Sequence, residues 1–304
     1  MKVNRIRQNV FPVLAAFIWG TAFVAQSVGA DYVEPFTFNA ARSGIAFLFL
    51  LVLCAVLRKR RERDFAGEAK AAPGSRRDLA VGGICCGTAL TVASFLQQKG
   101  LETTTSGKAG FITALYIVIV PLLGVFIKKK IPKITWLCVG IAVVGFYLLC
   151  VKEGFSVSAG DLLVLCCAFF FSIHIMVIDY FNGKQVDGVR MSCIQFLVAG
   201  LISLVLMLVF EQPSLENLWA AKGSILYAGV LSCGVAYTLQ ILGQRDTEPT
   251  TATLILSLES VFAALSGWAL LHETLSFKEL AGCALVFAAV ILAQIPLPVK
   301  AKKD

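Results

Sequence analysis

The sequence predicts an all-α integral membrane protein with ten transmembrane helices, arranged as two inverted repeats of five helices. Three observations predict this fold class. Of the 304 residues, 58% are apolar and 15% are charged, and the mean hydropathy is +0.80, whereas a soluble domain carries about 25% charged residues. Apolar runs of about 20 residues recur along the chain, each long enough to cross a hydrocarbon layer of roughly 30 Å. Finally, two stretches of the sequence repeat each other.

Short polar segments ending in proline separate the expected spans, as in residues 31–35, 128–132 and 246–249. The first apolar run continues from Val10 to Val28 without a small-residue cleavage site, so it predicts a transmembrane span and not a signal peptide. The ten expected spans are residues 10–28, 36–57, 79–96, 104–127, 134–151, 162–181, 189–210, 225–242, 250–271 and 277–295.

The basic residues orient these spans. With the N-terminus inside, 20 of the 27 Lys and Arg residues fall in inside segments and only 3 fall in outside loops. This asymmetry predicts a multi-pass protein of the cytoplasmic membrane with both termini in the cytoplasm. The net charge of +8 therefore indicates contact with the lipid bilayer, and no nucleic-acid partner is expected.

An internal repeat supports the count of ten. At an offset of 146 residues, the segment LQQKGLETTT (residues 96–105) aligns with LGQRDTEPTT (residues 242–251), and Gly83 aligns with Gly229. Gly83 also begins a Gly-x-x-x-Gly pattern, which permits close helix packing.

The two repeats are expected at residues 9–151 and 161–296, where an offset near 152 places Trp19 on Phe171. Five spans per repeat is an odd number, so the second repeat must be inverted relative to the first. Inverted repeats around a shared central site are typical of secondary transporters. A duplicated bundle that serves only as a scaffold is the alternative.

Several segments resemble one known family. They are FIWGTAF (residues 17–23), FTFNAAR (36–42), AYTLQ (236–240), LSLESVFAA (256–264) and LHE (271–273). In order and spacing they resemble the EamA-type family of the drug/metabolite transporter superfamily. The resemblance implies a ten-helix carrier that exports small metabolites, amino acids or related compounds among them. It also implies a cavity between the repeats, with the fifth and tenth helices outside it.

Ionisable residues within the spans are the first candidates for the site, because charges inside a membrane are costly. Glu259 lies nine residues into its span, roughly 13 Å deep at 1.5 Å per residue, where it either pairs with a cation or lines an aqueous cavity. Lys108 either extends to the membrane surface or faces the transport pathway. Arg42 is either structural or a clamp for a substrate carboxylate.

Four further residues complete the candidate substrate-binding or coupling set. His174 is either a hydrogen-bonded core residue or a proton carrier, as Glu259 also could be. Trp19 is expected either to pack or to form a wall for the ligand. Tyr237 and Gln240 place a hydroxyl and an amide in the eighth span, for packing or for binding.

A carrier for a small molecule is the leading functional hypothesis. The alternative is an integral-membrane enzyme that uses His174 with Asp179 or Glu259 as acid and base, although the first two residues point to different faces of a helix. No GxxxxGK[ST] motif for ATP is present. The ten cysteines lie in apolar runs without CxxC spacing, so no metal site and no cofactor is expected.

Overall fold

The computed structural model describes residues 2–64, 75–129, 131–150, 158–245, 247–270 and 276–294. All regular secondary structure in these ranges is helical. Eight segments are long and apolar enough to cross a membrane, and two shorter apolar helices complete the ten expected spans. The predicted fold class is therefore confirmed. Residues 65–74, 151–157, 271–275, which include the segment LHE, and 295–304 lie outside the described residues.

The helices follow the expected spans closely. The first half contains α1 (Lys2–Ala30), α2 (Pro35–Asp64), α3 (Arg76–Gly100), α4 (Ser106–Ala114), α5 (Tyr116–Phe126) and α6 (Lys133–Cys150). The second half contains α7 (Ala159–Gly183), α8 (Gly188–Phe210), α9 (Leu215–Ala220), α10 (Lys222–Leu226), the π-helix η1 (Tyr227–Ala236), α11 (Tyr237–Gln244), α12 (Pro249–Leu256), α13 (Leu258–Leu270) and α14 (Phe277–Gln294). Side-chain caps fix the first turns of α3, α4, α7 and α8, from Ser75, Thr105, Ser158 and Asp187 respectively.

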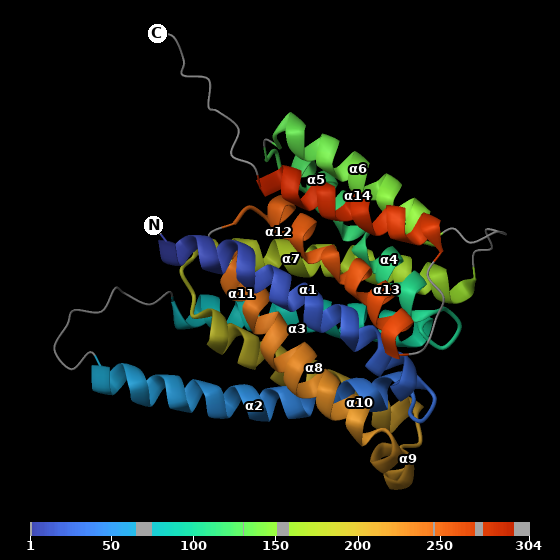
Figure 1. Ribbon diagram of the computed structural model, residues 1–304. Helices are drawn as coiled ribbons and strands as arrows, with labels where there is room; N and C mark the ends of the chain where they lie inside the picture. The colour runs from blue at the N-terminus through green and yellow to red at the C-terminus, as the bar shows by residue number, and fades with distance from the viewer. Residues whose placement is uncertain are drawn as a thin grey trace.

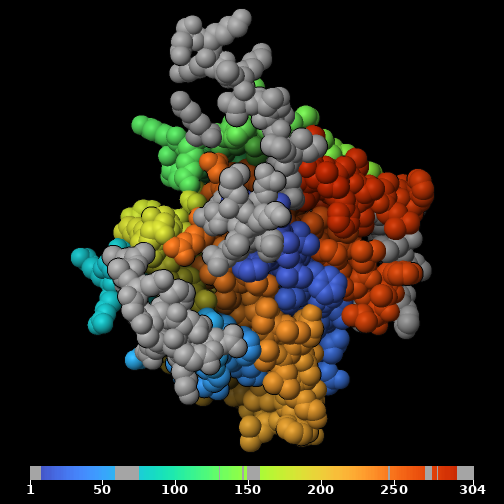
Figure 2. Space-filling model, turned by 60° about the vertical axis from the view of Figure 1, so that its left-hand side comes forward, coloured from blue at the N-terminus to red at the C-terminus, as the bar shows by residue number. Residues whose placement is uncertain are grey.

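The first helix of each half packs against the other half. Helix α1 contacts α13, η1 and α11, and helix α7 contacts α3, α4 and α5. If the two halves were exchanged, the contacts of α1 would correspond to those of α7, as a repeated fold requires. In Figure 2, α1 (dark blue) lies between the orange helices of η1 and α11 and the red-orange helix α13.

Equivalent glycines in the two halves make equivalent helix contacts. A Cβ atom on Gly83 of α3 would lie 2.4 Å from the Ile194 side chain on α8, and one on Gly229 of η1 would lie 2.8 Å from the Ile45 side chain on α2. The absence of a side chain at both positions lets the helix backbones approach closely. The alignment of Gly83 with Gly229 therefore has a structural basis.

Helices α6 and α14 pack side by side at one edge of the bundle, and α2 lies at the opposite edge (Figure 1). None of the described side chains of α6 and α14 lines the main cavity. The fifth and tenth spans thus lie outside it, as the family resemblance implies.

Helix α3 is longer than the expected span, which ended at residue 96. It continues to Gly100 because its two final glutamines find partners inside the bundle. Gln97 donates to the Thr113 hydroxyl at 3.1 Å, and Gln98 donates to the Gln26 carbonyl at 3.0 Å. Buried polar side chains are tolerated in a helix when they are hydrogen-bonded.

Candidate functional site

A cavity lies at the centre of the bundle, where α1, α2, α3, α4, α5, α7, η1, α11, α12 and α13 meet. About 470 Å³ between its lining residues, the mouth included, is free of protein atoms. Both halves line it, and all but one of its fourteen lining residues are buried. A central cavity shared by two repeats is the usual place for a substrate in a carrier.

Two of the helices that line the cavity are broken beside it. Helix α4 ends at Ala114 and α5 begins at Tyr116, while α12 ends at Leu256 and α13 begins at Leu258. At each break a backbone N–H donates to the carbonyl three residues earlier, from Leu115 to Ile112 and from Ser260 to Ser257. Such tight turns within a helix often mark a hinge.

Serine and threonine side chains satisfy the backbone around the break between α12 and α13. The hydroxyl groups of Thr253, Ser257 and Ser260 each donate to the carbonyl three residues earlier, at 2.7–2.8 Å. These bonds compensate the backbone carbonyls that the broken helix exposes. The small and hydroxyl residues of this span therefore support the break that presents Glu259.

The carboxyl group of Glu259 lines the cavity and has no cationic partner among the described residues. The residue is 3% exposed, and its Oε1 atom makes no hydrogen bond. The Tyr116 hydroxyl is its polar neighbour across the break in α4–α5. An ionised carboxylate enclosed in this way costs several kcal/mol, which either a proton or a cationic group on a ligand would relieve.

Arg42 lies on the same cavity, seven residues into α2. It is 4% exposed, and its Nη1 atom donates to Gln26 Oε1 at 2.7 Å. Its guanidinium carbon also lies 5.4 Å from the centre of the Phe38 ring. In the described part of the chain it forms no ion pair, so no described carboxylate compensates its positive charge.

Aromatic rings form a wall of the same cavity. Trp19 and Tyr237 meet edge to face with ring centroids 4.7 Å apart, and Phe23 and Phe171 line the same space. The π-helix η1 supports this wall, because its Ser232 carbonyl accepts a hydrogen bond of 3.3 Å from the indole N–H of Trp19. Gln240, one turn beyond Tyr237, places its amide in the cavity.

His174 lies behind this wall and does not line the cavity. It is fully buried, its Nε2 atom lies 3.1 Å from Gln195 Oε1, and its ring meets Tyr237 edge to face. Asp179, its candidate partner in an enzyme, instead forms an ion pair with Lys129 near the end of the helix. No contact in the described ranges joins His174 to Asp179 or to Glu259.

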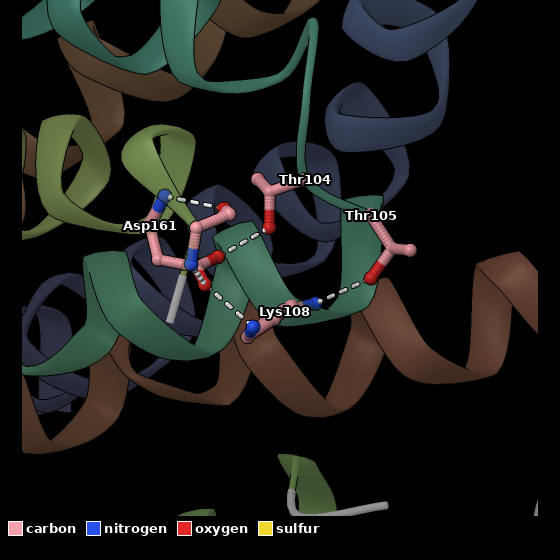
Figure 3. A network of polar contacts seen from close by, with 5 residues as sticks. Thr104, Thr105, Lys108 and Asp161 are labelled. Atoms are coloured by element: carbon pink, nitrogen blue, oxygen red, sulfur yellow. Dashed lines mark hydrogen bonds and ion pairs between the residues drawn. The ribbon is translucent and has the colours of Figure 1, made fainter. Parts of the chain in front are cut away.

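Lys108 also lies outside the cavity, at the start of α4. Its ammonium group is 2.5 Å from Asp161 Oδ2 at the start of α7, and the Thr104 hydroxyl donates to Asp161 Oδ1 at 2.6 Å (Figure 3). Asp161 belongs to a capping box with Ser158, in which each side chain bonds the other's backbone N–H. Lys108 is thus paired near the membrane surface and does not face Glu259.

Five of the seven candidate residues therefore share one cavity: Trp19, Arg42, Tyr237, Gln240 and Glu259. Sequence reasoning missed Gln26, Gln97, Thr113 and Tyr116 as lining residues. Gln97 lies one residue beyond the third span as predicted, which ended at residue 96. These lining residues could have been found by looking for polar side chains that face one another near the ends of neighbouring spans.

Comparisons with known proteins agree with this architecture. The EamA-like transporter family matches residues 8–151 and 158–294. A relative named as an uncharacterized transporter from Archaeoglobus fulgidus is 31% identical over 96% of this chain and 87% of its own length. The uncharacterized transporter YoaV of Bacillus subtilis is 22% identical over 92% of this chain and 94% of its own length.

Two more distant similarities extend the comparison. A chloroplastic WAT1-related protein of Arabidopsis thaliana is 25% identical over 92% of this chain and 67% of its own length. A solved crystal structure superposes with a TM-score of 0.75 and 17% identity, over 94% of this chain and 96% of the other, and shows the shared fold. The chain belongs to the EamA-like transporter family, and it is a multi-pass membrane transporter of the drug/metabolite type.

Proposed function

We propose that this protein is a secondary carrier that exports small zwitterionic metabolites, amino acids or related compounds, across the cytoplasmic membrane by alternating access. The observation that carries the proposal is the pair of opposite charges in one cavity. Arg42 and Glu259 both line it, and neither has an ion-pair partner in the described chain. A ligand with a carboxylate and an ammonium group would compensate both charges at once.

The aromatic wall supports an apolar body on such a ligand. Trp19, Tyr237 and Phe23 present rings to the space between the two charges. Aromatic side chains bind apolar groups well and lose little conformational entropy in doing so. A zwitterion with an apolar side chain therefore fits this cavity better than a sugar or a nucleotide.

Alternating access is supported by the architecture. The cavity lies between two repeats, for which we propose residues 9–151 and 161–296, and two of its helices are broken beside it. Broken helices at a shared site are typical of carriers that expose the site to each side in turn. When the cavity is empty, a proton on Glu259 would take the place of the ammonium group, which would couple transport to protons.

Binding can test the charge requirement without any membrane barrier. We expect leucine to raise the melting temperature of the purified protein. Leucine methyl ester lacks the carboxylate and N-acetyl-leucine lacks the ammonium group, so each should have a much smaller effect. Equal stabilisation by all three compounds would contradict the proposal. The absence of stabilisation by leucine and by every other zwitterion tried would also contradict it.

Transport can then be tested by counterflow in proteoliposomes. We expect saturable exchange of labelled leucine. Loss of one charged hydrogen bond costs about 1.5–3 kcal/mol, so Glu259→Gln and Arg42→Gln should each raise the half-saturating concentration by roughly 10- to 100-fold. The matched control is Lys184→Gln, which removes a charge just after α7 that does not line the cavity and is paired with Asp78. A loss of exchange in the control as well would indicate damage unrelated to the site.

A further inference from the structure

Two ion pairs lie at the opposite ends of one helix pair that lines the cavity. Lys108 of α4 pairs with Asp161 of α7 at one end, and Lys129, which follows α5, pairs with Asp179 of α7 at the other. The cavity-lining residues of these helices lie between the two pairs in sequence, at Thr113 and Tyr116 on α4–α5 and at Phe171 and Ile175 on α7. Each pair joins the first half of the protein to the second.

The two pairs differ in how strongly they are held. Asp161 is 4% exposed and accepts hydrogen bonds from Lys108, the Thr104 hydroxyl and the Ser158 backbone N–H (Figure 3). The Lys108 side chain is 30% exposed, whereas the Lys129 and Asp179 side chains are 41% and 25% exposed, so the two pairs differ mainly in the burial and hydrogen bonding of the carboxylate. An exposed ion pair contributes little to stability, whereas a buried and hydrogen-bonded one is costly to break.

Close helix packing reinforces the end at Asp161. A Cβ atom on Gly160 would lie 2.3 Å from the Thr103 hydroxyl and 2.6 Å from the Gly100 carbonyl. The end of α3 therefore also packs closely against the start of α7. A ligand cannot pass between α3, α4 and α7 at this end without breaking both the ion pair and these contacts.

The pseudo-equivalent position in the other repeat has no such pair. Lys108 is the third residue after the N-cap of α4, and the third residue after the N-cap of α12 is Thr251. The offset of 152 that relates the first helices places Asn9 on Asp161. Neither Thr251 nor Asn9 is charged, so the Lys108–Asp161 ion pair between the two repeats has no counterpart at the pseudo-equivalent positions.

We propose that the Lys108–Asp161 and Lys129–Asp179 pairs are the closing contacts of the cavity at its two ends, and that they open alternately, the exposed Lys129–Asp179 pair more readily. This inference rests on the alternating access proposed above. Both contacts are formed in this structure. Opening the Lys129 end exposes the cavity to the predicted cytoplasmic side, and opening the Lys108 end exposes it to the outside.

The test measures access to the cavity from each side. Thr113→Cys places a reporter thiol between the two contacts, and an impermeant maleimide labels it in right-side-out or in everted vesicles. The parent protein without the reporter corrects for native cysteines. Lys129→Met should accelerate labelling from the cytoplasmic side, and Lys108→Met should accelerate labelling from the outside by roughly tenfold.

A control variant and the results that would contradict the proposal complete the test. Lys184, the residue that follows α7, pairs with Asp78 at the start of α3 and not with a residue of α4 or α5, so Lys184→Met should leave both rates unchanged. Unchanged labelling in both test variants, or acceleration from the same side in both, would overturn the proposal. Labelling needs no substrate, so side-specific labelling without counterflow would refute the proposed function and leave the closing contacts standing.

A second variant covers the case in which Lys108→Met does not fold. Lys108→Cys combined with Asp161→Cys allows a reversible thiol cross-linker to hold this end shut. The cross-link should abolish labelling of a cavity cysteine from the outside and preserve labelling from the cytoplasmic side, and a reductant should restore the first. Outside labelling that persists through a complete cross-link would contradict the assignment of this contact.

Discussion

At the scale of single residues, Glu259 and Asp161 are two buried carboxyl groups with opposite roles. Asp161 has an ammonium partner and several hydrogen bonds, whereas Glu259 has no cationic partner in the described chain. Removing one member of a buried pair leaves the other uncompensated, at a cost of about 3–5 kcal/mol. Removing a group that has no partner carries no such cost.

This contrast predicts different outcomes for two neutral substitutions. Glu259→Gln should express and fold normally, and Lys108→Met should lower the melting temperature, because it leaves Asp161 without its cation. Circular dichroism during heating of the purified variants measures both. A Glu259→Gln protein that fails to fold while Lys108→Met is unaffected would reverse the two assignments.

Glu259→Gln should also change the response of transport to pH. Glu259 is the one carboxyl group among the described lining residues, so its replacement removes the group that would exchange protons with the cavity. We expect flux at saturating substrate to vary with pH in the parent protein and to be independent of pH in the variant. A pH dependence that is the same in both would exclude Glu259 as the proton carrier.

At the scale of elements, the breaks in α4–α5 and α12–α13 could not be predicted from the sequence. Neither break has a glycine or proline at the break itself, and Pro121 lies six residues beyond Leu115. Apolar residues continue through both breaks, so hydropathy gives no sign of an interruption. The existence of each span was predictable from its length and hydropathy, whereas its internal geometry depends on neighbours far away in the sequence.

The close contact between α1 and α13 gives a prediction at this scale. A Cβ atom on Gly20 would lie 2.3 Å from Phe262 Cβ and 2.8 Å from the Glu259 carbonyl, whereas one on Gly44 would meet no atom within 4 Å. Gly20→Ala should therefore force α13 away and destabilise the protein by about 1–3 kcal/mol. Gly44→Ala should have no such effect, since alanine favours a helix. Thermal unfolding of the two variants provides the comparison.

At the scale of the whole molecule, the sequence predicted the repeat but not the way in which the halves exchange helices. The aligned segments and the match of Gly83 with Gly229 indicated a duplication. The contact of α1 with α13, and of α7 with α4, depends on how apolar surfaces fit together, and apolar side chains carry little positional information. For the same reason the sequence identified the charged candidates but could not show that Arg42 and Glu259 share a cavity while Lys108 does not.

The predicted orientation can be tested on the whole protein. Single cysteines at Asp31 or Glu34, between α1 and α2, should react with an impermeant maleimide in intact cells. A cysteine at Lys129 should react only after permeabilisation. Reaction of the Lys129 position in intact cells would contradict cytoplasmic termini, and an equal reaction at both positions in permeabilised cells is the control for reagent access.

The Lys108–Asp161 ion pair, which has no counterpart at the pseudo-equivalent positions, has a consequence for kinetics. It makes the outward-facing and inward-facing forms of the empty carrier unequal in free energy, but gradients alone determine where net movement stops. The affinity seen from each compartment is scaled by the fraction of carriers facing it. A carrier that rests facing the cytoplasm therefore has a lower half-saturating concentration on the cytoplasmic side than on the outside. Its maximal velocities in the two directions differ by a matching factor, so the point at which net movement stops is unchanged. Such a protein binds its substrate efficiently at low cytoplasmic concentrations and takes it up poorly from the medium, although no step in its cycle is irreversible.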